Sequence, residues 1–119
     1  SLDDTIALAA ELKASGRIDL IDCSSGGNDP RQQIPIHPGY QVPFSSAVRE
    51  KAEIATGAVG LIHSPELAES ILANGQADLI FLGRALLADP NWPMRASVQL
   101  KAKSFQWPLQ YERGSIYFG

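Results

Sequence analysis

The chain has 119 residues and a formal net charge of -3, a length that suits one small domain with a core. The mildly acidic balance, with no cluster of lysine or arginine, argues against a nucleic acid partner, and the longest apolar runs are too short to span a membrane. A first segment without a basic region and a single cysteine, Cys23, lead us to expect a cytoplasmic protein with no internal disulfide.

Helical patterns and short apolar runs alternate along the chain. In order we expect a helix over 2–14, a strand over 20–23, a loop over 24–42, a helix from Pro43 to Lys51, a strand over 55–59, a helix from Pro65 to Asn74-Gly75, a strand over 79–82, a helical turn from Arg84, a helix over 92–101 and an irregular tail over 105–119. This alternation predicts an α/β fold with a parallel sheet that is covered on both faces.

A weak internal repeat relates residues 11–21 to residues 70–80. Each copy holds the end of a helix, a Ser-Gly or Asn-Gly stop, and a strand entered through Asp-Leu-Ile. Gly16 and Gly75 therefore stand where a left-handed residue follows a helix C-cap. Asp19 and Asp78, at the starts of the two strands, are interpreted as turn or cap residues.

Glycines end two of the expected strands, and an arginine follows one of them. Gly60 ends the segment 55–62, and Gly83-Arg84 ends the segment 78–84. Glycine lets a backbone N–H group approach a ligand closely, and arginine offers a bidentate fork to a phosphate. Each residue alone also fits a structural role. Together, after neighbouring strands, they predict a phosphate site of the kind found in (β/α)8 barrels.

Other polar residues give weaker indications. Ser24-Ser25-Gly26-Gly27 fits equally a flexible turn or a loop that lies against a cofactor. Cys23 is expected to be a buried, inert thiol. His37 and His63 are expected in surface loops, and the sequence contains no metal-ligand spacing.

Six segments, in this order and across nearly the whole chain, resemble the Old Yellow Enzyme family of FMN-dependent ene-reductases. The nearest likeness is to the bacterial, thermophilic-like branch that includes xenobiotic reductases. The segments are Asp-Leu-Ile-Asp-Cys-Ser-Ser-Gly-Gly at 19–27, Pro-Gly-Tyr-Gln-Val-Pro-Phe at 38–44, Ala-Thr-Gly-Ala-Val-Gly-Leu-Ile at 55–62, Ala-Asp-Leu-Ile-Phe-Leu-Gly-Arg at 77–84, Asp-Pro with Trp-Pro within 89–93, and Gln-Tyr-Glu-Arg-Gly at 110–114.

The resemblance implies that residues 1–104 form strands six to eight of a (β/α)8 TIM barrel, preceded by a helix. It implies a C-terminal fragment of an FMN-dependent NADPH oxidoreductase, which reduces activated alkenes by hydride transfer from reduced flavin. Gly60, Gly83 and Arg84 match the family's contacts to the FMN phosphate. The family's catalytic residues belong to the first half of the barrel, so the resemblance places none in this chain and implies that the isolated chain is inactive.

The aromatic tail over 105–119 carries one further expectation. Arg113 matches an arginine that, in this branch, reaches from the tail into the active site of a neighbouring subunit, which implies a homo-oligomer. The family often has an aromatic residue directly after the Arg-Gly pair. Ser115 stands there instead, with Tyr117 or Phe118 as the candidate substitute.

Two other interpretations stay open at this point. The chain fits a non-catalytic half-barrel that acts as a binding or assembly module, because opened strand edges at 20–23 and 79–82 would expose pairing groups. The glycines at the strand ends also permit another flavin barrel, such as a dihydroorotate-type oxidase, which the segment Tyr111-Glu-Arg-Gly114 does not favour.

Overall fold

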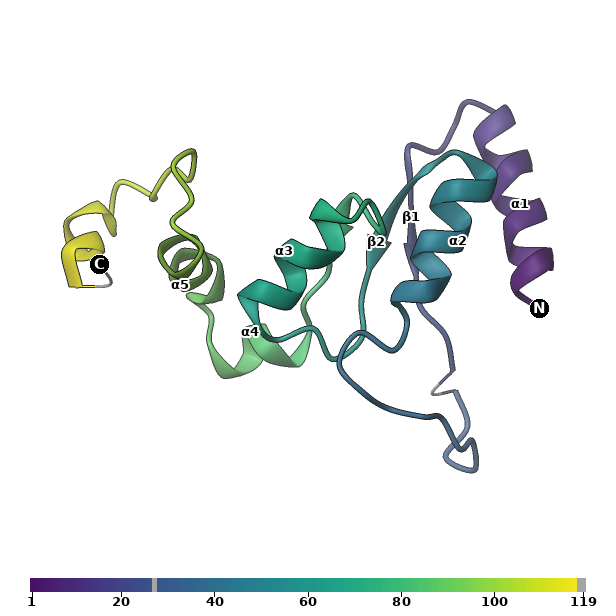
Figure 1. Ribbon diagram of the computed structural model, residues 1–119, viewed down its shortest axis with the longest axis horizontal. Helices are drawn as coiled ribbons and strands as arrows, with labels where there is room; N and C mark the ends of the chain where they lie inside the picture. The colour runs from purple at the N-terminus through teal and green to yellow at the C-terminus, as the bar shows by residue number, and fades with distance from the viewer. Residues whose placement is uncertain (27, 118–119) are drawn as a thin grey trace.

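Helices and strands alternate along the computed structural model, which describes residues 1–26 and 28–117 (Figure 1). Their bounds are α1 (Leu2–Ala14), β1 (Leu20–Cys23), α2 (Val42–Ala52), β2 (Ala55–Ala58), α3 (Pro65–Ala73), β3 (Leu79–Ile80), α4 (Arg84–Ala88), α5 (Trp92–Gln99) and the 3-10 helix η1 (Glu112–Tyr117). Most bounds agree with the sequence prediction to within one or two residues. Among these, β3 ends at Ile80 and α5 at Gln99, each two residues before the expected end. The tail, expected to be irregular, differs in kind because it contains η1.

Residues with a strong preference for helix ends begin and end α3. The Ser64 hydroxyl caps the helix by accepting a hydrogen bond from the Leu67 N–H at 3.1 Å, with Pro65 at the first helical position. Gly75 follows the C-cap with φ +68° and donates its N–H to the Leu72 carbonyl. Gly16 has the same left-handed conformation after α1, with φ +66°. Both copies of the repeat therefore end their helices as expected.

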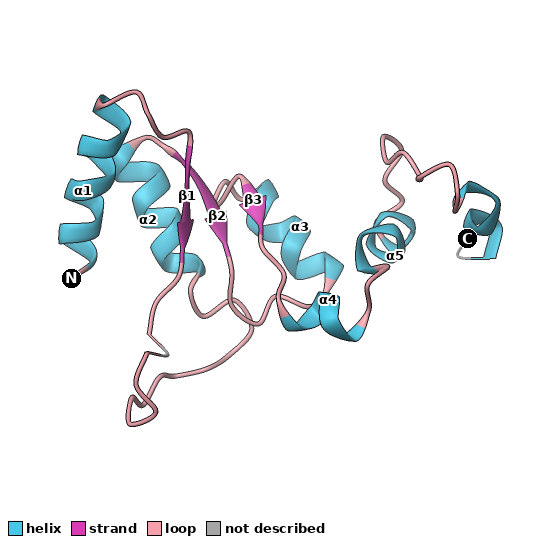
Figure 2. Ribbon diagram, turned by 180° about the vertical axis from the view of Figure 1, so that it is seen from behind, coloured by secondary structure: helices cyan, strands magenta, loops and turns pink. Residues whose placement is uncertain are grey.

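The three strands form one parallel sheet in the order β1-β2-β3 (Figure 2). Leu20 lies opposite Ala55, and Gly57 lies opposite Leu79. Because parallel strands end at the same edge, the segments that follow β1, β2 and β3 all leave from one side of the sheet. That edge is where the sequence places its candidate residues.

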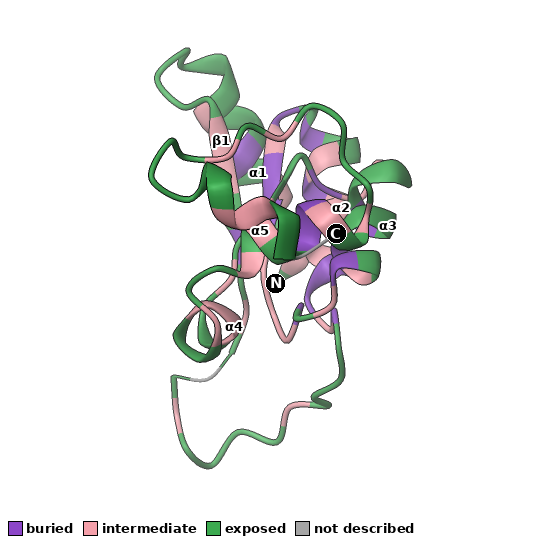
Figure 3. Ribbon diagram, turned by 90° about the vertical axis from the view of Figure 1, so that its left-hand side faces the viewer, coloured by how far each residue is buried: buried purple, intermediate pink, exposed green. Residues whose placement is uncertain are grey.

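Helices cover only one face of this sheet within the described residues. Ile21, Cys23 and Ala58 face the helices and belong to two apolar clusters, which α1, α2 and α3 complete. On the opposite face the side chains of Leu79 and Phe81 are 51% and 37% exposed. Figure 3 shows the buried residues gathered around α2 and the strands, while the long loop is mostly exposed. The expectation of a sheet covered on both faces is therefore wrong for this chain.

The molecule is more extended than its length requires. Its radius of gyration is 16.5 Å, whereas a compact chain of this size would have about 14 Å. In Figure 1, α5 and the tail reach away from the sheet. No helix in the described residues is long and apolar enough to cross a membrane.

Asp78, interpreted from sequence as a turn or cap residue, joins three elements. Its Oδ2 atom accepts hydrogen bonds from the Thr56 N–H at 2.9 Å and from Arg49 Nε at 3.0 Å. Arg49 also donates Nη1 to the Gly75 carbonyl at 3.0 Å. The bond from Arg49, with that from Thr56, holds the pKa of Asp78 below its ordinary value. The carboxylate therefore ties β2 and the start of β3 to α2.

Replacing Asp78 with alanine should lower the free energy of unfolding by about 1–2 kcal/mol, a modest loss because the side chain is 35% exposed and screened by water. A lowered folded pKa means that this contribution is complete above the unfolded pKa of about 3.9 and is lost as the pH falls through the folded value. Urea unfolding followed by circular dichroism should show the difference at neutral pH and its decrease as the pH falls below the unfolded pKa.

Asp19→Ala is the matched control, because Asp19 holds the equivalent position in the repeat, is exposed, and has no hydrogen bond among the described residues. An equal loss in both variants would show that the Asp78 hydrogen bonds do not carry the effect.

Candidate functional site

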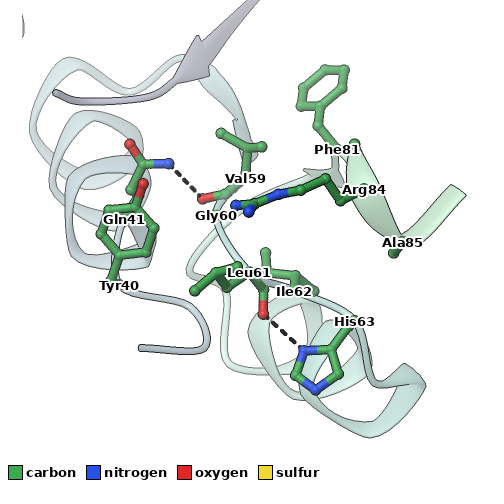
Figure 4. A pocket seen from close by; sticks show the side chains of 11 residues that line it. Tyr40, Gln41, Val59, Gly60, Leu61, Ile62, His63, Phe81, Arg84 and Ala85 are labelled. Carbon is green, nitrogen blue, oxygen red and sulfur yellow. Dashed lines mark hydrogen bonds between the residues drawn. The ribbon is translucent and has the colours of Figure 1, made fainter. Parts of the chain in front are cut away.

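A pocket of about 290 Å3 lies at the edge of the sheet where β2 and β3 end (Figure 4). We call it the strand-end pocket. Its lining comes from the segment before α2, the turn after β2 and the turn into α4, and consists of Tyr40, Gln41, Val59, Gly60, Leu61, Ile62, His63, Phe81, Gly83, Arg84 and Ala85.

The structure brings Gly60, Gly83 and Arg84 together in this pocket, as the sequence predicts. Arg84 begins α4, and Figure 4 shows its side chain extending toward Gly60. Arg84 is exposed, and in residues 1–26 and 28–117 no carboxylate pairs with its guanidinium. A cation with unused donors therefore faces a glycine at the end of the neighbouring strand.

The two glycines serve the pocket in different ways. Gly60 has φ +119°, and a Cβ there would lie 2.8 Å from Gln41 Nε2 and 3.0 Å from the Tyr40 ring. A side chain at position 60 is therefore excluded by both backbone conformation and space. A Cβ at Gly83 would meet no atom within 4 Å, so glycine there leaves the side of the pocket next to Arg84 open.

Gln41 is a site residue that the sequence analysis did not single out. Its side chain is buried, with 4% of the residue exposed. The Oε1 atom accepts hydrogen bonds from the Ser25 N–H and, at 3.1 Å, from the Ser25 hydroxyl. The Nε2 atom donates to the Val59 carbonyl at 3.2 Å. Gln41 lies within one of the family-like segments, but only contacts distant in sequence reveal what it holds.

These contacts also bear on the segment 24–27. Ser25 is anchored by Gln41 instead of standing in a free turn, and Gly26 has φ +70°. Gly27 lies outside the described residues. The segment follows β1 directly, so Gln41 connects the end of that strand to the strand-end pocket.

Apolar groups and one histidine complete the lining. The Phe81 ring lies over Gly57, where an added Cβ would be 1.9 Å from a ring carbon. His63 is exposed, as expected, yet it also lines the pocket, with Nδ1 3.0 Å from the Leu61 carbonyl. Its own carbonyl accepts a hydrogen bond from Trp92 Nε1 at 2.8 Å. The side chain of Trp92, which follows both strands in sequence, thus holds the turn after β2 that forms one wall of the pocket.

The remaining candidates lie elsewhere. Cys23 is buried, as predicted, and burial raises the pKa of its thiol, with a smaller contribution from Asp22, which fits an inert group. His37 is exposed and outside the pocket lining, and Arg113 is exposed on η1. Phe118, one of the candidate aromatic substitutes, lies outside the described residues, and those residues contain no group of three potential metal ligands.

The chemistry offered by the strand-end pocket is that of an anion site beside apolar groups. Its lining residues include no carboxylate. They include a glycine turn and Arg84, which pairs with no carboxylate in the part of the chain that the structure describes. Such a site suits a phosphate, which accepts hydrogen bonds from guanidinium and backbone N–H groups.

The sequence of this chain is similar to those of known proteins. Residues 4–103 match the model of the NADH:flavin oxidoreductase / NADH oxidase family. An NADPH dehydrogenase of Halalkalibacterium halodurans is 54% identical over 112 residues, which are 94% of this chain and 32% of the relative. An NADPH dehydrogenase of Bacillus subtilis is 50% identical over 111 residues, or 93% and 32%. One of Geobacillus thermodenitrificans is 48% identical over 114 residues, or 96% and 33%.

The chain therefore spans about a third of the length of these relatives. The matched range contains all three strands and the whole lining of the strand-end pocket. Because the family model covers residues 4–103, the chain belongs to the NADH:flavin oxidoreductase / NADH oxidase family.

Proposed function

We propose that this chain supplies the FMN-phosphate site of an FMN-dependent NADPH oxidoreductase, as the C-terminal part of a (β/α)8 barrel. The observation that carries the proposal is that Gly60, Gly83 and Arg84 meet at the ends of two adjacent parallel strands, and that Arg84 pairs with no carboxylate among residues 1–26 and 28–117. Barrel enzymes of this architecture commonly bind phosphate after their seventh and eighth strands.

The presence of helices on only one face of the described sheet supports the proposed barrel. In a (β/α)8 barrel the helices lie outside, and the other face of each strand points into a packed interior. Here the face without helices carries the apolar, partly exposed Leu79 and Phe81, which suit such an interior. Further strands would pair with β1 and β3, because both are edges of the described sheet.

The residues fit the phosphate end of FMN. Arg84 would pair with the phosphate charge, while the backbone at Gly60 and Gly83 approaches it without a side chain between them. The chemistry that FMN supplies when bound is hydride transfer, from NADPH to an alkene conjugated to a carbonyl or nitro group. This chain's residues bind and orient, and the groups that polarise the substrate belong to the part of the barrel outside it. The single buried Cys23 suits the reducing cytoplasm that we propose as its setting.

The alternative is an assembly module without catalysis, which the two open strand edges favour. Such a module would dock on a partner half-barrel and use the same pocket residues only for structure. Family membership argues against the third interpretation, a dihydroorotate-type oxidase.

Replacing Arg84 with alanine should weaken binding of FMN and of inorganic phosphate by about tenfold or more, because one charge-assisted hydrogen bond contributes about 1.5–3 kcal/mol. Arg84→Lys should recover part of the affinity, since it keeps the charge and loses the fork. The measurement is a titration of the 15N-labelled chain followed by amide chemical shifts at Gly60, Gly83 and residue 84.

Riboflavin, which lacks the phosphate, should leave these amides unshifted. The control variant is Arg17→Ala, an exposed arginine outside the pocket lining. Equal shifts with riboflavin and FMN, or no shifts with either, would contradict a phosphate site.

The purified chain alone should not reduce cyclohexenone with NADPH in the presence of FMN, because its pocket holds only the phosphate end. Loss of NADPH absorbance is the measurement, with an enzyme of established enone-reducing activity as the positive control for the assay. Sustained enone reduction by the 119-residue chain would show that the catalytic groups lie within it.

Deleting residues 105–119 should reduce self-association of the chain, if the tail carries the subunit contact. The tail exposes Leu109 at 84%, Ile116 at 75% and Tyr117 at 86%, an apolar surface suited to a partner. Sedimentation over a range of concentrations should show association for residues 1–119 and less for residues 1–104. Association that persists in the shorter chain would point to the strand edges and to the assembly module, and a folded monomer at every concentration would contradict both.

A further inference from the structure

Two successive carbonyl groups in the turn after β2 are held from the same side. Gln41 Nε2 donates to the Val59 carbonyl at 3.2 Å. The Gly39 N–H donates to the Gly60 carbonyl at 3.0 Å. Both donors belong to the short segment that leads into α2, so residues 39–41 fix the orientation of two consecutive peptide planes.

Those planes determine where the next two N–H groups point. In a trans peptide the C=O and N–H bonds point in opposite directions, and the described residues contain no cis peptide bond. The N–H groups of Gly60 and Leu61 must therefore point away from residues 39–41. In residues 1–26 and 28–117 neither N–H has a hydrogen-bond acceptor. Both residues line the strand-end pocket with Arg84.

Gln41 can hold this geometry because both the oxygen and the nitrogen of its side-chain amide are hydrogen-bonded. The Ser25 N–H can only donate and the Val59 carbonyl can only accept, which fixes Oε1 toward Ser25 and Nε2 toward Val59. The residue is 4% exposed, so water cannot replace a lost bond without cost. A Cβ at Gly60 would strike Nε2 at 2.8 Å, which shows how closely the amide approaches the turn.

We infer that Gln41 is a positioning residue that directs the N–H groups of Gly60 and Leu61 toward the phosphate of the bound cofactor. The inference rests on the proposed function and deepens it: Arg84 supplies the charge, and Gln41 orders two backbone donors opposite it. Through Ser25, the same side chain is also hydrogen-bonded to the segment that follows β1.

The test compares Gln41→Met, which keeps the length of the side chain but neither hydrogen bond, with the unchanged chain. Gln33→Met is the matched control, because Gln33 lies in the same loop, is exposed, and has no hydrogen bond among the described residues. Each 15N-labelled chain is titrated with inorganic phosphate and with FMN, and the amide shifts of Gly60 and Leu61 are followed. We expect binding about fivefold to tenfold weaker in Gln41→Met and unchanged in Gln33→Met.

The outcomes separate the two claims. If the unchanged chain shows no shifts with phosphate or FMN, the proposed function fails, and the inference fails with it. If the unchanged chain binds and Gln41→Met binds equally well with the same shifts at Gly60 and Leu61, only the inference is overturned. Because Gln41→Met leaves buried groups without partners, its thermal unfolding midpoint should fall, and the titrations are compared at a temperature where both chains are folded.

Two measurements keep the test decisive if Gln41→Met does not fold. Gln41→Glu retains an acceptor for the Ser25 N–H but, when ionised, has no donor for the Val59 carbonyl, and should also bind phosphate more weakly. In the unchanged chain, phosphate should slow hydrogen exchange at the Gly60 and Leu61 amides, because it supplies their missing acceptor. If saturating phosphate leaves the hydrogen-exchange rates of both amides unchanged, the inference is overturned without the need for a variant.

Discussion

Pairing of β2 with a parallel strand on each side is the constraint on which the rest of the structure depends. The register places Leu20 opposite Ala55 and Gly57 opposite Leu79, so the three strands end at one edge. The turn after β2 then lies between the segment that follows β1 and the start of α4. Residues far apart in sequence meet there because the sheet aligns the strand ends, and no single turn would bring them together.

Local chemistry explains why much of this arrangement is readable in the sequence. Ser64 with Pro65, and the left-handed Gly16 and Gly75, mark helix ends through interactions within a few residues. Gly60 and Arg84 are recognisable because the ends of parallel strands are known to share an edge. In each case the information lies in residue types and short spacings, and the fold then brings the strand-end residues close together.

The features that sequence reasoning missed depend on partners chosen by the fold. Asp78 resembles a turn residue until Thr56 and Arg49 come within hydrogen-bond distance of it. The Gln41 side chain has no local partner among the described residues, and its role is set by Ser25 and Val59, 16 and 18 positions away. The bare face of the sheet was also missed, because apolar strands look alike whether helices or further strands cover them. These errors share one cause, which is that long-range contacts leave little trace in a short window of sequence.

The contact between Gly57 and Phe81 limits how this sheet can vary. The ring at position 81 occupies the space that a side chain at position 57 would need, since a Cβ there would lie 1.9 Å from a ring carbon. Positions 57 and 81 therefore share one fixed volume, and a larger side chain at one position requires a smaller side chain at the other. In an alignment of family members, this would appear as an inverse dependence of side-chain size between two positions on neighbouring strands. Pairs of that kind would give the register of β2 and β3 from sequences alone.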